Sequence, residues 1–232
     1  MVSVTPRTVA AIVSFVIGIP TIAHAQSDEA DRVTEAGVIL NEIMEAPDRA
    51  IPSLVLEKAE AIAVFPSAIR GAFLVGVQQG KGIISVRNRA KREWSLPAFL
   101  TLTRGSFGIG GQVVDIILVV TTRRGVVNLF QNEFEIGGEV SATAGPVGRN
   151  APPSTDIQLS AEILSYLRSR GLFAGGSLEG VTVRQDQFAN QQFYGSRFRT
   201  QDIVLDGKAA KPQAVEATRT WRAALSKYAP NR

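Results

Sequence analysis

The stretch "SYLRSRGLFAGGSLEG", residues 165–180, places two arginines before a run of glycines and small apolar residues. We interpret residues 161–170 as a helix with the two arginines at its end, and the glycine-rich part that follows as a strand. Glycine is unfavourable inside a strand unless another group comes close or the strand bends sharply. A strongly curved, barrel-like sheet supplies that reason, so we expect Gly175 and Gly176 to serve backbone geometry.

Most of the chain before this stretch has a β pattern, and helical patterns lie at both ends. "GQVVDIILVVTT" (111–122) is nearly continuous in β-branched residues, which is typical of a strand buried on both faces. "QQGKG" (78–82) predicts a turn. Apolar residues at helical spacing predict helices at 27–46 and 212–228, with a shorter one near 186–195. The predicted fold is therefore α+β: a strongly curved, barrel-like antiparallel sheet with N-terminal and C-terminal helices packed on it.

The first 25 residues have the features of a secretory signal peptide. Arg7 is their only side-chain charge, the apolar run "VAAIVSFVIGI" spans 9–19, and "AHA" ends at Ala25. This order predicts cleavage after Ala25 and export, most simply to a bacterial periplasm. A membrane anchor is the alternative, but the run is well short of the ~20 residues that span a bilayer.

Cleavage would remove His24, the only histidine, from a chain that has no cysteine. The remaining chain could then form no Ser–His–Asp or Cys–His site and no zinc site with nitrogen or sulfur ligands. We therefore expect neither a cofactor nor a metal. The net charge of +4 falls by one with the loss of Arg7, which leaves a mildly basic protein. Export makes nucleic acid an improbable partner and anionic phospholipid the more available polyanion.

Six segments in order resemble the SYLF lipid-binding domain family. They are "AEAIAVFPS" (59–67), "WSLPAF" (94–99), "GGQVVDIILVV" (110–120), "ATAGPVGRNA" (142–151), the opening stretch (165–180) and "FYG" (193–195). The chain departs from the family pattern at Gly108, where a polar residue is expected. With this resemblance the predicted division is 1–25 signal peptide, 26–50 N-terminal helix, 51–195 SYLF-like domain and 196–232 C-terminal helical extension.

The resemblance implies lipid binding without enzymatic activity. Eukaryotic members are described as binding phosphoinositides, and some fungal members as binding actin. A periplasm contains neither, so these ligands do not transfer to an exported chain. We expect an anionic phospholipid or membrane surface as the partner, with an envelope protein as the alternative.

Two groups of residues are the candidate lipid-binding site. The most cationic window, 81–92, is followed at once by a tryptophan, and it predicts a basic hairpin tip beside an interfacial anchor. An ordinary solvated turn is the alternative. The other group could bind a lipid phosphate or, alternatively, could lie at the end of the predicted helix. The candidates are Lys81, Arg87, Arg89, Lys91, Arg92 and Trp94 from the window, and Arg168 and Arg170 from the opening stretch.

Two further features have a functional and a structural interpretation. Asp115 interrupts an apolar strand and could be the base of a carboxylate-dependent hydrolase, but we expect it to accept backbone N–H bonds or to pair with an arginine. The C-terminal helix carries Trp221 on a stripe of alanines. Such a weak apolar face favours docking on the domain over insertion into a bilayer.

Overall fold

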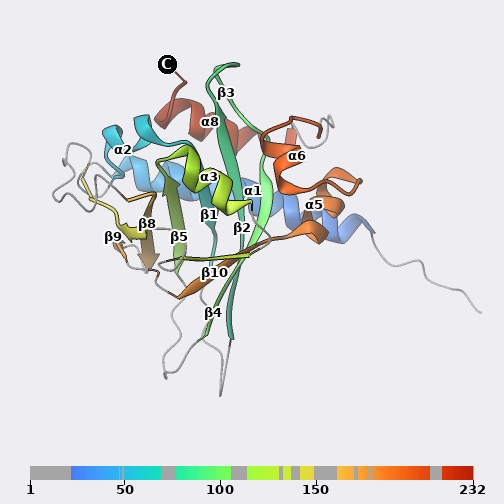
Figure 1. Ribbon diagram of the computed structural model, residues 1–232, viewed down its shortest axis with the longest axis horizontal. Helices are drawn as coiled ribbons and strands as arrows, with labels where there is room; N and C mark the ends of the chain where they lie inside the picture. The colour runs from blue at the N-terminus through green and yellow to red at the C-terminus, as the bar shows by residue number, and fades with distance from the viewer. Residues whose placement is uncertain are drawn as a thin grey trace, which may run out of the picture.

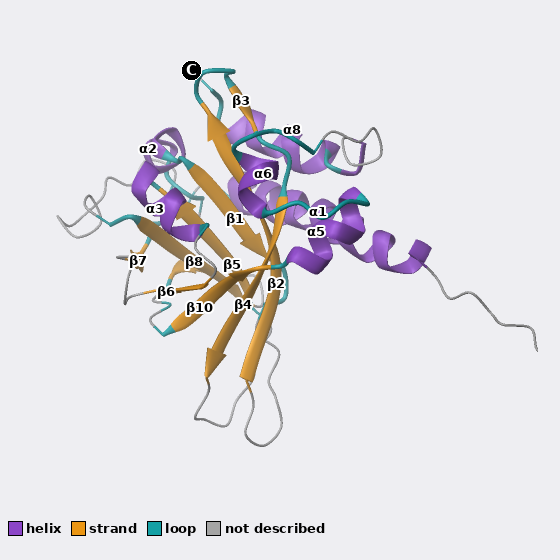
Figure 2. Ribbon diagram, turned by 45° about the vertical axis from the view of Figure 1, so that its right-hand side comes forward, coloured by secondary structure: helices purple, strands orange, loops and turns teal. Residues whose placement is uncertain are grey.

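The computed structural model describes residues 22–46, 48, 50–68, 77–105, 114–130, 133–136, 142–148, 161–169, 172–176, 178, 180–209 and 216–231. It is an α+β fold in which one sheet curves nearly into a barrel, with helices against it (Figures 1 and 2). The helices are α1 (Ile22–Glu45), α2 (Ser53–Lys58), α3 (Arg123–Leu129), α5 (Gln187–Tyr194), α6 (Thr200–Val204) and α8 (Arg219–Tyr228). The strands are β1 (Ala61–Phe65), β2 (Val77–Asn88), β3 (Glu93–Trp94), β4 (Ala98–Gly105), β5 (Asp115–Val120), β6 (Glu133–Ile136), β7 (Ala142–Ala144), β8 (Ile163–Ser169), β9 (Leu172–Gly175) and β10 (Val181–Gln185).

The sheet has the strand order β6-β10-β4-β2-β1-β5-β8-β7, with β3 paired to β2 and β9 paired to β8. Only the short β7–β8 pair is parallel among the described strands, so the predicted antiparallel sheet is confirmed. The central strands β1 and β5 are buried almost throughout, as the apolar run in 111–122 predicts.

The register of the strands defines two ends of the sheet. At one end Ala61 of β1 pairs with Val86 of β2 and with Val120 of β5. This is the end where β2 leads into the turn at residues 89–92, and we call it the turn end. At the opposite end Asp115 pairs with Arg168. The two ends are separated by the length of β5.

Strand β2 runs without a break through residues 78–82, so the turn predicted there is wrong. The glycines in this segment allow β2 to lie close to its neighbours. A Cβ atom at Gly82 would lie 2.4 Å from Cδ1 of Phe65, and one at Gly80 would lie 2.7 Å from Cβ of Ala68. These distances are shorter than van der Waals contact, so close packing accounts for both glycines.

The opening stretch also differs from its predicted helix. Residues Ile163–Ser169 form β8, which pairs along its length with β5. A short apolar run does not distinguish a strand from a buried helix by periodicity alone, and here the ladder with β5 decides. In the glycine-rich part Leu172–Gly175 forms β9, and Gly180, at φ 73°, directly precedes β10. Gly175 does serve close approach, because a Cβ there would lie 2.1 Å from the carbonyl oxygen of Gly145.

Helices α1 and α8 pack against each other and against β2, which confirms that the C-terminal helix docks on the domain. Trp221 is fully buried, and its Nε1 donates to Oγ of Ser85 at 2.9 Å. The two helices meet at Gly37, where a Cβ would lie 2.7 Å from the backbone nitrogen of Trp221. Residues 1–21 lie outside the described residues, and cleavage after Ala25 stays a prediction.

Candidate anion-binding site

The basic hairpin predicted from the sequence is present at the turn end. Strands β2 and β3 pair through Arg87 with Trp94 and through Asn88 with Glu93. Oδ1 of Asn88 accepts the backbone N–H of Lys91 at 3.0 Å and closes the turn. The side chains of Arg89, Lys91 and Arg92 are exposed on the turn, and we call these three residues the turn cations.

Arg87 lies at the base of this turn but is only 3% exposed. Its guanidinium donates to three carbonyl oxygens: Nε to Ala59 at 2.7 Å, Nη1 to Pro230 at 2.8 Å and Nη2 to Leu56 at 2.8 Å. Burial first, and then the neighbouring Arg89, lower the pKa of Arg87. No carboxylate of the described residues forms an ion pair with it. Arg87 therefore ties together three segments, and its positive charge lacks a paired carboxylate.

Trp94 is also buried, with 5% exposure. Its Nε1 donates to the carbonyl oxygen of Ala229 at 2.8 Å, and the guanidinium of Arg87 lies 4.7 Å from its ring. The prediction of an exposed tryptophan beside the turn is therefore wrong. The C-terminal segment after α8 covers the indole ring, which leaves Arg87 and Trp94 with a structural role.

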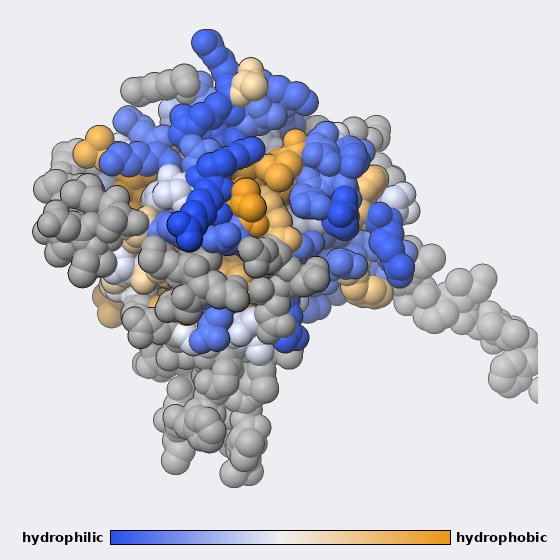
Figure 3. All heavy atoms as spheres, in the orientation of Figure 1, coloured by the Kyte–Doolittle hydropathy of each residue, from blue (hydrophilic) through white to orange (hydrophobic). Residues whose placement is uncertain are grey.

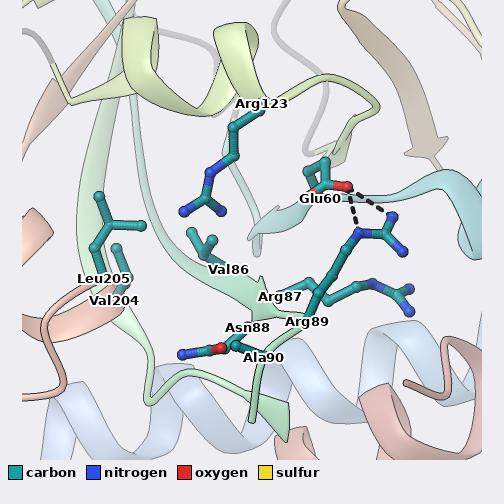
Figure 4. Close-up of a pocket in the computed structure, with 9 residues that line it drawn as sticks. All are labelled: Glu60, Val86, Arg87, Asn88, Arg89, Ala90, Arg123, Val204 and Leu205. Carbon is teal, nitrogen blue, oxygen red and sulfur yellow. Dashed lines mark hydrogen bonds and ion pairs between the residues drawn. The ribbon is translucent and has the colours of Figure 1, made fainter. Parts of the chain in front are cut away.

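A pocket of about 420 Å³ lies beside the turn, between α3 and the segment at the end of α6 (Figure 4). It is lined by Glu60, Val86, Arg87, Asn88, Arg89, Ala90, Arg123, Val204 and Leu205. Nε and Nη2 of Arg89 contact Oε1 of Glu60 at 2.8 and 2.6 Å. Arg123, the first residue of α3, projects into the pocket above Val86, and it has no ion pair among the described residues.

Sequence reasoning missed Arg123. Arg123 and Arg124 precede a short apolar run, which is a common place for exposed charged residues. The neighbouring sequence contains no motif that indicates a ligand-binding residue. Only the fold brings the start of α3 over β2. The sequence does show an excess of basic over acidic residues in the whole chain. This excess indicates that some cations are unpaired, but it does not identify Arg123 as one of them.

A second pocket of about 200 Å³ adjoins the first and shares Asn88, Val204 and Leu205 with it. Lys91 and Arg222 line this pocket, and neither has an ion pair among the described residues. Glu93 is the one carboxylate among its lining residues. Asp202 on α6 does not line the pocket, and its contacts with Arg199 and Lys208 hold its pKa well below its usual range. Figure 3 shows hydrophilic side chains gathered around a smaller hydrophobic patch on this face.

Arg168 lies at the opposite end of the sheet and is paired there. Its Nε donates to Oδ2 of Asp115 at 2.7 Å, and its Nη1 contacts a carboxylate oxygen of Glu42. Oδ1 of Asp115 accepts the backbone N–H of Ser67 at 2.9 Å. The structural interpretation of Asp115 is therefore confirmed, and Arg168 is a strand residue held between two carboxylates.

The remaining predicted site residues do not join the turn cations. Lys81 is exposed on β2, about 20 Å from Arg87 along an extended strand. Arg170 lies outside the described residues. The structure thus brings together Arg87, Arg89, Lys91 and Arg92 from the predicted set, adds Arg123 and Arg222, and separates Lys81 and Arg168.

Among the described residues, His, Cys, Asp and Glu side chains do not gather in threes around a place that could hold a metal ion. None of the described helices combines the length and apolar character needed to cross a membrane.

Comparison with known proteins gave consistent matches. A family model named Ysc84, described as "Las17-binding protein actin regulator", matches residues 103–227. SH3 domain-containing YSC84-like protein 1 of Rattus norvegicus is 32% identical over 202 residues, which cover 84% of this chain and 59% of the relative. LAS seventeen-binding protein 3 of Saccharomyces cerevisiae (strain YJM789) is 29% identical over 203 residues, which cover 85% and 43%. The chain thus spans less than two thirds of the length of these curated relatives.

Proposed function

The chain belongs to the Ysc84 family, and on this premise we propose that it is a non-enzymatic protein that binds anionic membrane surfaces through the turn end of its sheet. The family match covers residues 103–227, and the SYLF domain is associated with lipid binding. The turn end offers the attraction that such binding needs, because cations near an anionic bilayer each contribute about 1 kcal/mol.

The observation that carries this proposal is the imbalance of charge around the two pockets. Arg123, Lys91 and Arg222 line them without ion pairs among the described residues. The two linings hold five cationic side chains in all and two carboxylates, Glu60, which pairs with Arg89, and Glu93. Lipid phosphates are suitable counter-ions for such a surface, because arginine binds phosphate oxygens through charge-assisted hydrogen bonds.

The buried tryptophan changes the mechanism from the one that the sequence indicates. Trp94 cannot insert into a bilayer while its ring lies under the C-terminal segment. Attraction through exposed cations therefore accounts for most of the proposed affinity. If residues 1–25 direct export, the available anionic surface is a phospholipid membrane of the cell envelope, with the protein in the periplasm or peripherally on the membrane.

Co-sedimentation with vesicles tests this function. We expect binding to phosphatidylglycerol-containing vesicles at low salt and little binding to phosphatidylcholine vesicles. The binding should fade as salt rises from about 0.1 M to 1 M, because the screening length falls from about 10 to 3 Å. Equal binding to both lipids, or binding that salt does not weaken, would contradict the proposal.

A protein partner is the second candidate function. The matching family model is described as Las17-binding, and two neighbouring helices each expose an apolar residue. Leu54 on α2 is 54% exposed and Val127 on α3 is 55% exposed, and Figures 1 and 2 place these helices near each other. Absence of binding to both phosphatidylglycerol-containing and phosphatidylcholine vesicles would favour this candidate.

A further inference from the structure

We propose that the pocket between α3 and α6 binds a single phosphate group, with Arg123 as its principal ligand. This site goes beyond attraction to a membrane surface, since a soluble phosphate ester could occupy it equally well. The ligand class is a phosphate or phosphate monoester dianion. Its source could be a lipid head group or a small molecule in solution.

The charge inside the pocket favours a dianion. Three guanidinium groups line it, from Arg87, Arg89 and Arg123, and Glu60 is the one carboxylate among its lining residues. The guanidinium of Arg87 donates hydrogen bonds to three carbonyl oxygens, but its positive charge still lies beside the cavity. The lining therefore carries two positive charges in excess. A phosphate monoester bears a charge of about −1.5 to −2 at pH 7 and can neutralise them.

Arg123 is the lining arginine whose N–H groups are available to a ligand. Its guanidinium projects from the start of α3 into the cavity and has no ion pair among the described residues. The planar fork of an arginine matches two phosphate oxygens at once. Asn88 adds a second donor group, since its Oδ1 accepts the N–H of Lys91 and its amide nitrogen keeps its protons available.

The remaining wall of the pocket suits the neutral part of an ester. Val86, Val204 and Leu205 give it an apolar side, and a lowered local dielectric strengthens the pairing of charges. The volume of about 420 Å³ falls within the range of about 300–1,000 Å³ that small-molecule sites occupy. A phosphate with a short neutral group, such as glycerol phosphate, is therefore the expected size of ligand.

Two adjacent arginines of α3 provide a matched test. Arg123→Gln removes the guanidinium that projects into the pocket. Arg124→Gln removes one charge from the next position, where the side chain is 79% exposed, pairs with Glu162 and does not line the pocket. Both variants keep the length of the helix and lower the net charge equally, so a general electrostatic effect would weaken both alike.

The full chain and both variants are titrated with inorganic phosphate and with glycerol 1-phosphate at constant ionic strength, and amide shifts of Val204 and Leu205 are followed by NMR. We expect saturable shifts in the wild type and in Arg124→Gln, and about tenfold weaker binding in Arg123→Gln. Affinity for glycerol 1-phosphate should rise through pH 6 as the ester becomes a dianion. Absence of saturable shifts, or equal affinity in the two variants, would overturn the phosphate site for soluble ligands.

Vesicles containing phosphatidic acid distinguish the source of the phosphate. A loss of vesicle binding in Arg123→Gln but not in Arg124→Gln assigns the pocket to a lipid head group. Unchanged vesicle binding with weakened glycerol 1-phosphate binding assigns it to a soluble ester. If the two variants behave alike toward soluble phosphates and toward vesicles, the site is wrong. That result leaves the membrane function untouched, because the latter rests on salt and lipid dependence of the wild type.

Discussion

The two ends of the sheet hold similar arginines in opposite electrostatic settings. At the end with Arg168, one guanidinium lies between the carboxylates of Asp115 and Glu42. At the turn end, Arg87, Arg89 and Arg123 share a pocket with the single carboxylate of Glu60. Arg168 is thus neutralised within the fold, whereas the turn end keeps an excess of positive charge.

The difference shows that the availability of a cation depends on its partners in the fold. Burial also makes a cation unavailable to a ligand. Arg87 has no carboxylate partner, but carbonyl oxygens and the ring of Trp94 enclose its guanidinium. Arg123 has neither kind of partner among the described residues. Binding chemistry is therefore expected where cations are both unpaired and accessible, as they are around the turn-end pockets.

The largest expected effect on stability comes from Arg87, the structural member of the turn end. Arg87→Met would leave the carbonyl groups of Ala59 and Pro230 without this donor, at about 1–3 kcal/mol each. We expect the free energy of unfolding to fall by about 3 kcal/mol or more, and the melting temperature by roughly 6–12 °C. Thermal unfolding followed by circular dichroism measures this change.

Arg89→Met is the matched control for that variant. Its side chain is 56% exposed and pairs with Glu60 at the surface. Removing an exposed ion pair costs about 0–1 kcal/mol, so the melting temperature should change little. A similar loss in both variants would mean that Arg87 is not the clamp that its three hydrogen bonds indicate.

A smaller effect is expected at the opposite end. Arg168→Gln removes the bonds to Asp115 and Glu42, but Asp115 keeps the N–H of Ser67. Hydrogen bonds to charged groups contribute about 1.5–3 kcal/mol, and an exposed ion pair about 0–1 kcal/mol. The partly exposed Arg168 lies between these cases at about 1–2 kcal/mol, so we expect the melting temperature to fall by roughly 2–8 °C. Binding to anionic vesicles should not change. Weakened vesicle binding by a folded Arg168→Gln protein would remove the contrast between the two ends.

Local pattern in the sequence predicts part of this arrangement. The apolar run around Asp115 indicates a buried strand, and a lone carboxylate within it indicates a paired group, as found. The helix predicted at 161–170 is wrong, because pairing between β5 and β8 involves residues far apart in the chain. Trp94 is buried by contact with Ala229, which is far from it in the chain. Arg123 likewise reaches the pocket that Arg89 lines only through the fold. These contacts are set by tertiary packing, and local propensity contains no information about them.

The most direct test of the central claim removes two cations at the turn end in one variant and two cations away from it in another, and compares vesicle binding. Lys91→Gln with Arg92→Gln changes the turn end. Lys81→Gln with Arg184→Gln changes two exposed positions that both pair with Thr101 in the sheet, away from the turn. The account predicts roughly 30-fold weaker binding to anionic vesicles for the first pair, at about 1 kcal/mol per cation, and little change for the second. Equal weakening in two folded proteins would show that net charge, and not the turn end, determines binding, and would contradict the account.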